Sequence, residues 1–401
     1  PDYLTRTPSG ATNQKTFTIS YWVKRWGLQT GTSWQQVIGQ QASNYFRCGF
    51  NSNEQGDIIR MYGPSFEFRT TALYRDVSAW YHVVLAIDTT QAVEANRAKL
   101  YVNGTQVTSF STETIPGQNV DQDWNVAAAI VIGRSGSSGN DGSPSYLAQF
   151  VNIDGTAYAA SDFGEFDEDS GIWKPKDVSG LTFGTNGFFL DFADAADLGD
   201  DESGNTNDFA ETGIGATNQA TDTPTNNFAV GNPLLNYNPQ LTEGNLLLTS
   251  SGTAWKNSMS TIGLTSGIWY HEVKITAESG VPYGLIGVTD SYHPNSWGAS
   301  PPNYLGIGYL QIGYYNDNGT YYQNDGQQSY SGNGFGVNDT IGVLLNLDAG
   351  TPTIKFYKND ADQGAINLPT NSNSTGLWFF MQSVYIQTMS VNYGSPAHAI
   401  S

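Results

Sequence analysis

Hydrophobic and polar residues alternate in a regular way near the end of the chain. Residues 343–347 form an apolar run that ends at an aspartate, and a turn containing Gly and Pro follows at 349–352. Over the next run, residues 353–358, Ile354 and Phe356 would point to one side and the polar residues to the other. Period-two alternation next to a Gly and Pro turn predicts an antiparallel β-hairpin packed on one face.

The same pattern occurs once more, far upstream. Residues 82–88 form an apolar run that ends at Asp88, and residues 99–104 repeat the order Lys, apolar, Tyr, any residue, Asn. Two matched hairpins so far apart in the sequence predict two separate β-sandwiches. The predicted fold class is therefore all-β, with two antiparallel, jelly-roll-like sandwich domains joined by an acidic, ordered connector.

Residues 1–160 are predicted to form the first sandwich. Short strand patterns with turn residues between them are typical of a sandwich or jelly roll. These strands are 17–24, 34–40, 45–50, 57–62, 66–70, 80–88, 99–107, 127–133 and 146–153. The segment resembles the concanavalin-A-like, laminin-G-like jelly-roll family, and the motifs that carry the resemblance are residues 17–24, 79–88, 99–104, 132–134 and 146–150. The resemblance implies a fold and leaves the ligand open.

The composition changes after the first sandwich. Residues 161–232 are rich in Asp and Glu, yet they keep an apolar strand pattern at 187–192. This segment is too aromatic for a free linker. It is predicted to be a connector wrapped on the first domain or a small third subdomain.

Residues 233–401 are predicted to form the second sandwich, and they resemble a SPRY domain. The matching motifs are residues 267–273, 284–288, 339–348, 354–359 and 391–394. Because SPRY domains bind through variable loops, the resemblance implies a binding role and leaves the partner open.

The overall composition excludes several function classes. The net charge is −20, only 13% of residues are charged, and no Lys/Arg patch is present, which argues against nucleic-acid and anionic-membrane partners. No apolar stretch is long enough for a transmembrane helix, so no membrane insertion is expected. Cys48 is the only cysteine, which rules out an intramolecular disulfide. The first residues lack the apolar core of a signal peptide, which predicts a protein made in the cytoplasm.

Closely spaced acidic residues suggest one cofactor, calcium. Calcium takes six to eight oxygen ligands, and the region around a Gly turn supplies carboxylates every few residues without matching an EF-hand. The alternative is that these acids are surface charge and form local turns. The candidate ligands are Asp197, Asp200, Asp201 and Asp208.

Aromatic residues gather between Ser291 and Tyr330, interleaved with Asn and Asp. Flat rings beside hydrogen-bonding side chains suit carbohydrate, which offers C–H faces and hydroxyls. The alternative is that alternate tyrosines are buried and that the Asn and Gly residues form turns. The candidate glycan- or partner-binding residues are Trp297, Tyr304, Tyr314, Tyr315, Tyr321, Tyr322, Asn316 and Asp317.

Residues 165–169 are the strongest candidate for catalysis. Glycosidases of the concanavalin-A-like fold carry alternating acids on a strand, and Glu165, Asp167 and Asp169 alternate in this way. Glu168 occupies the face that would have to be apolar, however, and Ser170 with Gly171 indicates a loop. We therefore predict a solvated acidic loop, no catalytic residues and no enzyme activity. The four histidines show no metal-binding spacing.

The order of the predicted domains resembles virion surface proteins of tailed phages. That resemblance implies a non-enzymatic structural or adhesive protein, a capsid decoration, fibre or appendage subunit, made in the host cytoplasm and displayed on the virion surface. Its expected partners are other virion proteins and host-surface carbohydrate. A homo-oligomer is also expected, because neutral polar surface is buried at lower cost than charged surface. The alternatives are a glycan-degrading enzyme of the concanavalin-A-like fold and a cellular adhesin module.

Overall fold

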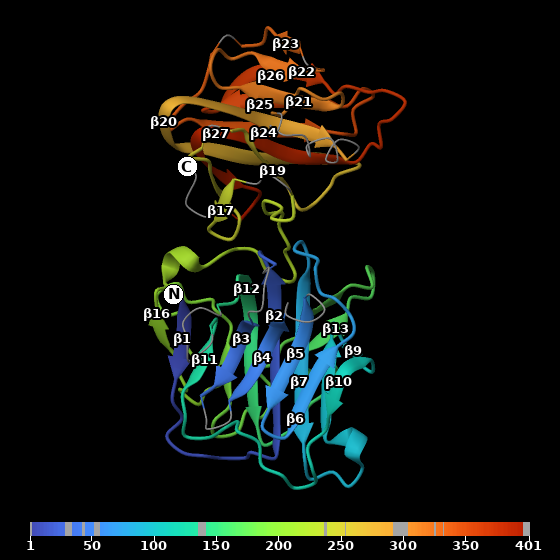
Figure 1. Ribbon diagram of the computed structural model, residues 1–401, viewed down its shortest axis with the longest axis vertical. Coiled ribbons are helices and arrows are strands. Elements are labelled where there is room, and N and C mark those ends of the chain that lie inside the picture. The colour runs from blue at the N-terminus through green and yellow to red at the C-terminus, as the bar shows by residue number, and fades with distance from the viewer. Residues whose placement is uncertain are drawn as a thin grey trace. The chain divides into compact units, whose positions relative to one another are not determined.

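The computed structural model describes residues 2–28, 34–41, 45–51, 57–134, 142–235, 239–252, 254–291, 304–324, 326–331 and 333–395 (Figure 1). Within these ranges the regular structure is β-strand, apart from three short 3-10 helices, η1 (Glu94–Asn96), η2 (Ala160–Asp162) and η3 (Ala216–Asn218). All sheet pairings between named strands are antiparallel. The all-β prediction with two antiparallel β-sheet domains is confirmed. None of the helices in the described ranges is long and apolar enough to cross a membrane.

The chain divides into two compact units. The first comprises Pro1–Gln219 with Thr223–Asn227, and the second comprises Ala220–Asp222 with Phe228–Ser401. The first unit therefore takes in most of the segment predicted as a connector.

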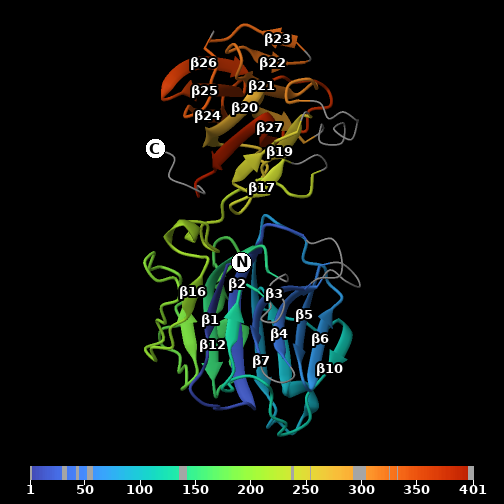
Figure 2. The same ribbon diagram turned by 60° about the vertical axis from the view of Figure 1, so that its left-hand side comes forward.

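Two sheets form the first unit, and Figure 2 shows β16 beside β1 at the edge of the larger one. The eight-stranded sheet has the order β10 (Phe110–Thr114), β6 (Phe66–Thr70), β5 (Ile58–Gly63), β4 (Phe46–Asn51), β3 (Trp34–Gln40), β11 (Ile130–Ile132), β1 (Tyr3–Arg6), β16 (Ala210–Thr212). The six-stranded sheet has the order β15 (Phe188–Leu190), β12 (Ser145–Asp154), β2 (Thr16–Arg25), β7 (Trp80–Asp88), β8 (Ala98–Val102), β9 (Thr105–Gln106). A separate hairpin joins β13 (Gly164–Phe166) to β14 (Trp173–Pro175).

Both faces of the six-stranded sheet are covered. One face contributes to the main core, where Phe17 lies near Trp124 and Phe46. On the other face, Val84 and Val151 pack against side chains from the acidic segment, including Phe163 and Phe183. Because β7 is buried on both faces, its sequence is a nearly continuous apolar run rather than an alternating one.

The second unit is organised around two long strands, β20 (Ile268–Asp290) and β27 (Trp378–Asn392), which pair with each other. Over residues 268–274 β20 also pairs with β24, and over residues 285–289 it pairs with β21. Strand β20 therefore pairs with β27 along one edge and with β24 and then β21 along the other. The other strands of this sheet are β17 (Gln240–Thr242), β18 (Leu247–Thr249), β19 (Lys256–Met259), β21 (Gln311–Tyr315), β22 (Tyr321–Gln323), β23 (Gly326–Gln328), β24 (Thr340–Asn346), β25 (Thr353–Lys358) and β26 (Ala361–Asn367).

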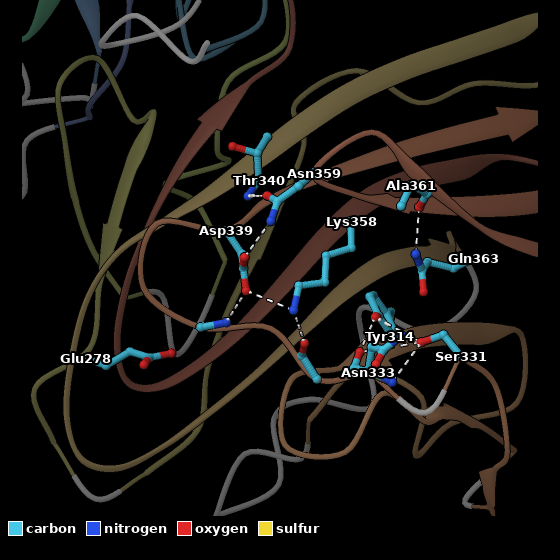
Figure 3. A network of polar contacts seen from close by, with 12 residues as sticks. Glu278, Tyr314, Ser331, Asn333, Asp339, Thr340, Lys358, Asn359, Ala361 and Gln363 are labelled. Atoms are coloured by element: carbon cyan, nitrogen blue, oxygen red, sulfur yellow. Dashed lines mark hydrogen bonds and ion pairs between the residues drawn. The ribbon is translucent and has the colours of Figure 1, made fainter.

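Strands β24 and β25 form the antiparallel hairpin that the alternation predicted. Ile354 and Phe356 are fully buried in the core of this unit. Figure 3 shows how polar contacts hold the preceding segment against the hairpin: Lys358 Nζ lies 3.2 Å from Asp339 Oδ2 and donates to the Gly334 carbonyl at 2.6 Å. Burial disfavours the charged form of Asp339, but the Gly336 N–H, the Asn359 amide and the Lys358 ammonium outweigh it and lower the pKa of Asp339.

Among the described residues, each unit contains one buried histidine. His82 on β7 stacks on Trp22, with 4.5 Å between ring centroids. The indole N–H of Trp173 donates to His82 Nδ1 at 3.0 Å, so the ring proton is on Nε2, which lies 2.8 Å from Ser20 Oγ. His82 therefore donates to Ser20 and is not placed to act as its base. In the second unit, His271 packs on Phe380, and burial lowers the pKa of both histidines to about 3.

These two histidines predict loss of stability in acid. The folded-state pKa of about 3 lies below the ordinary value of 6.5, so the unfolded chain takes up protons first as the pH falls. Stability is fully present above pH 6.5 and is lost between about pH 6.5 and 3, by up to about 1.4 kcal/mol per pH unit for each histidine. Denaturant unfolding of the wild type, His82→Gln and His271→Gln at several pH values measures this.

Each variant is expected to be less stable than the wild type at pH 7, and the difference should narrow as the pH falls. A difference that stays constant from pH 7 to pH 4 would show that the histidine carries no linked proton.

Candidate functional site

Six aromatic side chains of the second unit form a connected cluster, which we call the aromatic patch. All six are half-buried, so each ring has a protein-facing and a solvent-facing part. Neighbouring ring centroids lie 5.1–6.3 Å apart, within the range for favourable aromatic pairs. The members are Trp255, Tyr283, Tyr304, Tyr315, Tyr322 and Tyr385.

Strand pairing places these rings on one face. Tyr283 of β20 lies directly opposite Tyr385 of β27. Tyr322 of β22 is paired with Gly313, which has no side chain to compete for the space. Beneath the patch lie the buried side chains of Leu285, Leu305 and Met381, against which Trp255, Tyr304, Tyr315 and Tyr322 pack. The rings therefore rest on a rigid apolar base.

The hydroxyl group of Tyr315 remains protonated at neutral pH. Burial raises the pKa of Tyr315 strongly, and the charge of Asp317 and the neighbouring phenols raises it further. Asp317 itself is exposed on the turn between β21 and β22. The patch thus combines hydrogen-bonding phenols, apolar ring faces and a nearby carboxylate.

Two predicted site residues lie inside the protein and need correction. Tyr314 is fully buried in the core, and its hydroxyl donates to the Asn333 carbonyl at 2.6 Å (Figure 3). Asn316 is also buried, and its Oδ1 accepts the Gly284 N–H at 2.8 Å. Both side chains hold the segments around β20 and β21 together. They do not face the surface, because successive residues of a strand point to opposite sides.

The remaining predicted residues divide between two sides of the unit. Tyr304, Tyr315 and Tyr322 belong to the aromatic patch, whereas Tyr321 makes a right-angled contact with Tyr330 instead. Trp297 lies outside the described residues. The prediction also missed three members of the patch, Trp255, Tyr283 and Tyr385.

The missed residues lie on or beside strands outside residues 291–330. The prediction rested on the aromatic residues that gather in residues 291–330. A signal was present for Tyr283, because it is an aromatic residue next to the aliphatic strand pattern of residues 284–288. Tyr385 follows an aromatic run at 378–380 on the same strand and gave no such signal. Only the pairing of β20 with β27 brings the two together.

The predicted calcium ligands are engaged with the protein. Buried Asp201 accepts the backbone N–H groups of Phe189 and Asn207, each at 2.8 Å. Asp208 Oδ1 accepts the Asp201 N–H at 3.2 Å, and Asp197 Oδ1 accepts a local N–H at 3.1 Å. For Asp200, the backbone N–H donates to the Asp197 carbonyl. Over the described ranges, no group of three or more His, Cys, Asp or Glu could hold a metal ion.

Arg6 of β1 supplies a positive charge at this cluster. Its guanidinium donates to the side-chain oxygen of Asn207, and Asp201 and Asp208 are close enough to interact with its charge. Burial lowers the pKa of Arg6, and the two carboxylates partly offset this effect. Calcium binding stays a prediction. The guanidinium of Arg6 already places one positive charge beside Asp201 and Asp208, where the calcium hypothesis places the metal.

The carboxylates at 165–169 are also engaged locally. Lys174 Nζ lies 3.0 Å from Asp167 Oδ2 and 3.7 Å from Glu165 Oε1. The Ser170 backbone N–H, the Lys174 ammonium and the Ser170 hydroxyl hold the pKa of Asp167 well below its usual range. A glycosidase general acid needs a raised pKa, so these contacts suit an ionised, turn-forming aspartate.

Comparison with known families identifies two domain types. Residues 2–151 match the model of the concanavalin A-like lectin/glucanases superfamily. Residues 268–395 match the model of the SPRY domain. The chain therefore combines a concanavalin A-like, laminin G domain with a SPRY domain. A search of curated proteins found no match.

Solved structures similar to this chain include the SPRY domain of human HERC1, with 19% identity, 37% of this chain and 89% of that chain covered, and a TM-score of 0.29. The TRIM65 PSpry domain gives 15% identity, covers 41% of this chain and 88% of that chain, and has a TM-score of 0.31. Stonustoxin gives 19% identity, covers 41% of this chain and 27% of that chain, and has a TM-score of 0.30.

The contacts of Arg6 lead to a prediction that also tests the calcium hypothesis. Arg6→Met should destabilise the first unit by about 1–2 kcal/mol, because a hydrogen bond and a charge interaction with Asp201 and Asp208 are lost. Lys15→Met is the matched control, since its exposed ion pair with Asp121 spans 3.7 Å and should contribute little. Denaturant unfolding measures both variants.

Calcium or a chelator should leave the unfolding midpoint of the wild type unchanged. A calcium-dependent rise in that midpoint would contradict the Arg6 account and favour a metal at the aspartates.

Proposed function

We propose that this protein is a non-enzymatic carbohydrate-binding protein and that the aromatic patch of its SPRY domain contacts the sugar. The observation that carries the proposal is the continuous cluster of six half-buried rings on a buried apolar base. The coarser statement, that both domain types are compatible with binding roles, comes from the two family models.

The chemistry of the patch suits a sugar better than a purely apolar ligand. A sugar ring presents C–H groups that pack on aromatic faces and hydroxyls that need partners. Phenol groups provide hydrogen-bond donors and acceptors, and Asp317 offers an exposed carboxylate acceptor nearby. Because the rings are already packed against one another, little side-chain freedom is lost on binding.

We further propose that the protein acts on the surface of a virion, as a decoration, fibre or appendage subunit made in the host cytoplasm. Support comes from the composition: only 13% of residues are charged, so much of the polar surface is neutral. Such surface can be buried against other virion proteins, or against further copies of the same chain, at low desolvation cost. Mass spectrometry that finds the chain in purified phage particles would support this placement, and its absence from them would reject it.

Substitutions in the patch test the carbohydrate proposal. A glycan microarray with the full chain identifies the bound sugar, and calorimetry then compares variants. Tyr315→Ala and Tyr322→Ala should each lower the affinity by about tenfold, because each removes a ring contact. Tyr357→Ala is the matched control: it removes a half-buried tyrosine of β25 in the same unit, outside the patch, and should leave the affinity unchanged.

Failure to retain any glycan on the array would reject carbohydrate binding. Equal affinities for the wild type, Tyr315→Ala and Tyr322→Ala would instead keep carbohydrate binding and reject the patch as its site.

A further inference from the structure

A groove of about 470 Å³ lies on a different side of the second unit from the aromatic patch. One wall is formed by Tyr321, Gln323, Ser329 and Tyr330, and the other by residues 365–368. The walls belong to the two ends of the folded sheet, because β23 pairs only with β22 and β26 pairs only with β25 among the described strands. The groove therefore lies between two edges of the sheet.

Two tyrosine rings in the first wall stand nearly at right angles. The centroids of Tyr321 and Tyr330 are 5.8 Å apart, with an interplanar angle of 85°. The Tyr330 hydroxyl donates to the Gly364 carbonyl at 2.5 Å and accepts the Phe356 N–H at 3.4 Å. These bonds attach Tyr330 to β25 and to the bulge in β26, so one ring of the groove is fixed before any ligand arrives.

The polar groups of the groove are neutral and available. None of the lining residues is charged. The side chains of Gln323, Ser329 and Asn367 and the Tyr321 hydroxyl have no hydrogen-bond partner among the described residues. Ile366 and Leu368 add buried alkyl surface. The lining thus offers ring faces, alkyl groups, two amides and hydroxyls, without a group that would attract a charged ligand.

We propose that this groove is a second binding site and that it takes a neutral saccharide unit. Its volume is within the usual range for small-molecule sites. Most of its accessible lining is polar, which suits a ligand rich in hydroxyl groups. A neutral sugar matches each feature: C–H faces for the tyrosine rings, hydroxyls for the free amides, and no charge to desolvate without a partner.

The groove and the aromatic patch are separate sites. Tyr321 and Tyr322 are adjacent on β22 and therefore point to opposite faces of the strand. Tyr321 lines the groove, Tyr322 belongs to the patch, and no residue lines both. The groove proposal thus stands independently of the patch, and a variant in one site leaves the other intact.

Filling the groove tests the proposal. Saturation-transfer NMR with the full chain would use neutral mono- and disaccharides of glucose, galactose and N-acetylglucosamine, with glucuronic acid as the charged comparison. Ala365→Trp places a bulky ring at an exposed lining position, so it should abolish the groove signal and still fold. The matched control is Ala361→Trp, exposed on the same strand and outside the groove, which should bind like the wild type.

Tyr321→Ala should lower the affinity of the groove for its sugar by about tenfold, whereas Tyr322→Ala should leave the affinity of the groove unchanged. Near-UV circular dichroism confirms that each variant is folded. The proposal is overturned if no neutral sugar gives a saturable signal, if the signal survives Ala365→Trp in a chain that also carries Tyr315→Ala and Tyr322→Ala, or if glucuronic acid binds as well as its neutral counterpart.

Discussion

The pairing of β20 with β27 is the constraint on which the second unit depends. Residues 272–290 of β20 pair with β27, with register shifts between Ile275 and Ala277 and between Glu278 and Tyr283. On its other edge, β20 pairs with β24 before these shifts, over residues 268–274, and with β21 after them, over residues 285–289. A change in this pairing would separate Tyr283 from Tyr385 and move β21 and β22, which carry Tyr315 and Tyr322. The aromatic patch and the groove therefore depend on one pair of strands.

The first unit depends on burial of both faces of its six-stranded sheet. A sandwich sheet commonly leaves one face to solvent, but here residues of the acidic segment cover Val84 and Val151. Two of its acidic clusters have a cation close by, Arg6 at Asp201 and Asp208 and Lys174 at Asp167. The segment thus supplies apolar side chains to a core while its carboxylates remain at the periphery or in hydrogen-bonded turns.

Strand patterns predicted the fold because alternation reports directly which side chains are buried. The hairpin of β24 and β25 shows this, since Ile354 and Phe356 are buried as the pattern requires. Site residues were harder to predict. Whether Tyr314 or Tyr315 faces solvent depends on which side of β21 is covered, and the covering elements come from elsewhere in the chain.

Charge partners remote in sequence were likewise beyond prediction. The acids near 201 suggested calcium because their spacing supplies oxygen ligands, whereas the cation beside them is Arg6, near the start of the chain. Acidic residues that are close in the sequence can be recognised from the sequence. Which positively charged side chain the fold places beside them cannot. Contacts made only in the folded chain also explain why Trp255, Tyr283 and Tyr385 were not predicted. Their grouping with Tyr315 depends entirely on strand pairing.

The central claim is that sugar contacts the aromatic patch, and 19F NMR of the full chain labelled with 3-fluorotyrosine tests it most directly. Substitution by Phe at single positions assigns the resonances of Tyr315, Tyr322 and Tyr357, and the retained oligosaccharide is then titrated. We expect the Tyr315 and Tyr322 resonances to shift saturably while that of Tyr357 stays in place. Saturable shifts confined to tyrosines outside the patch would contradict the claim.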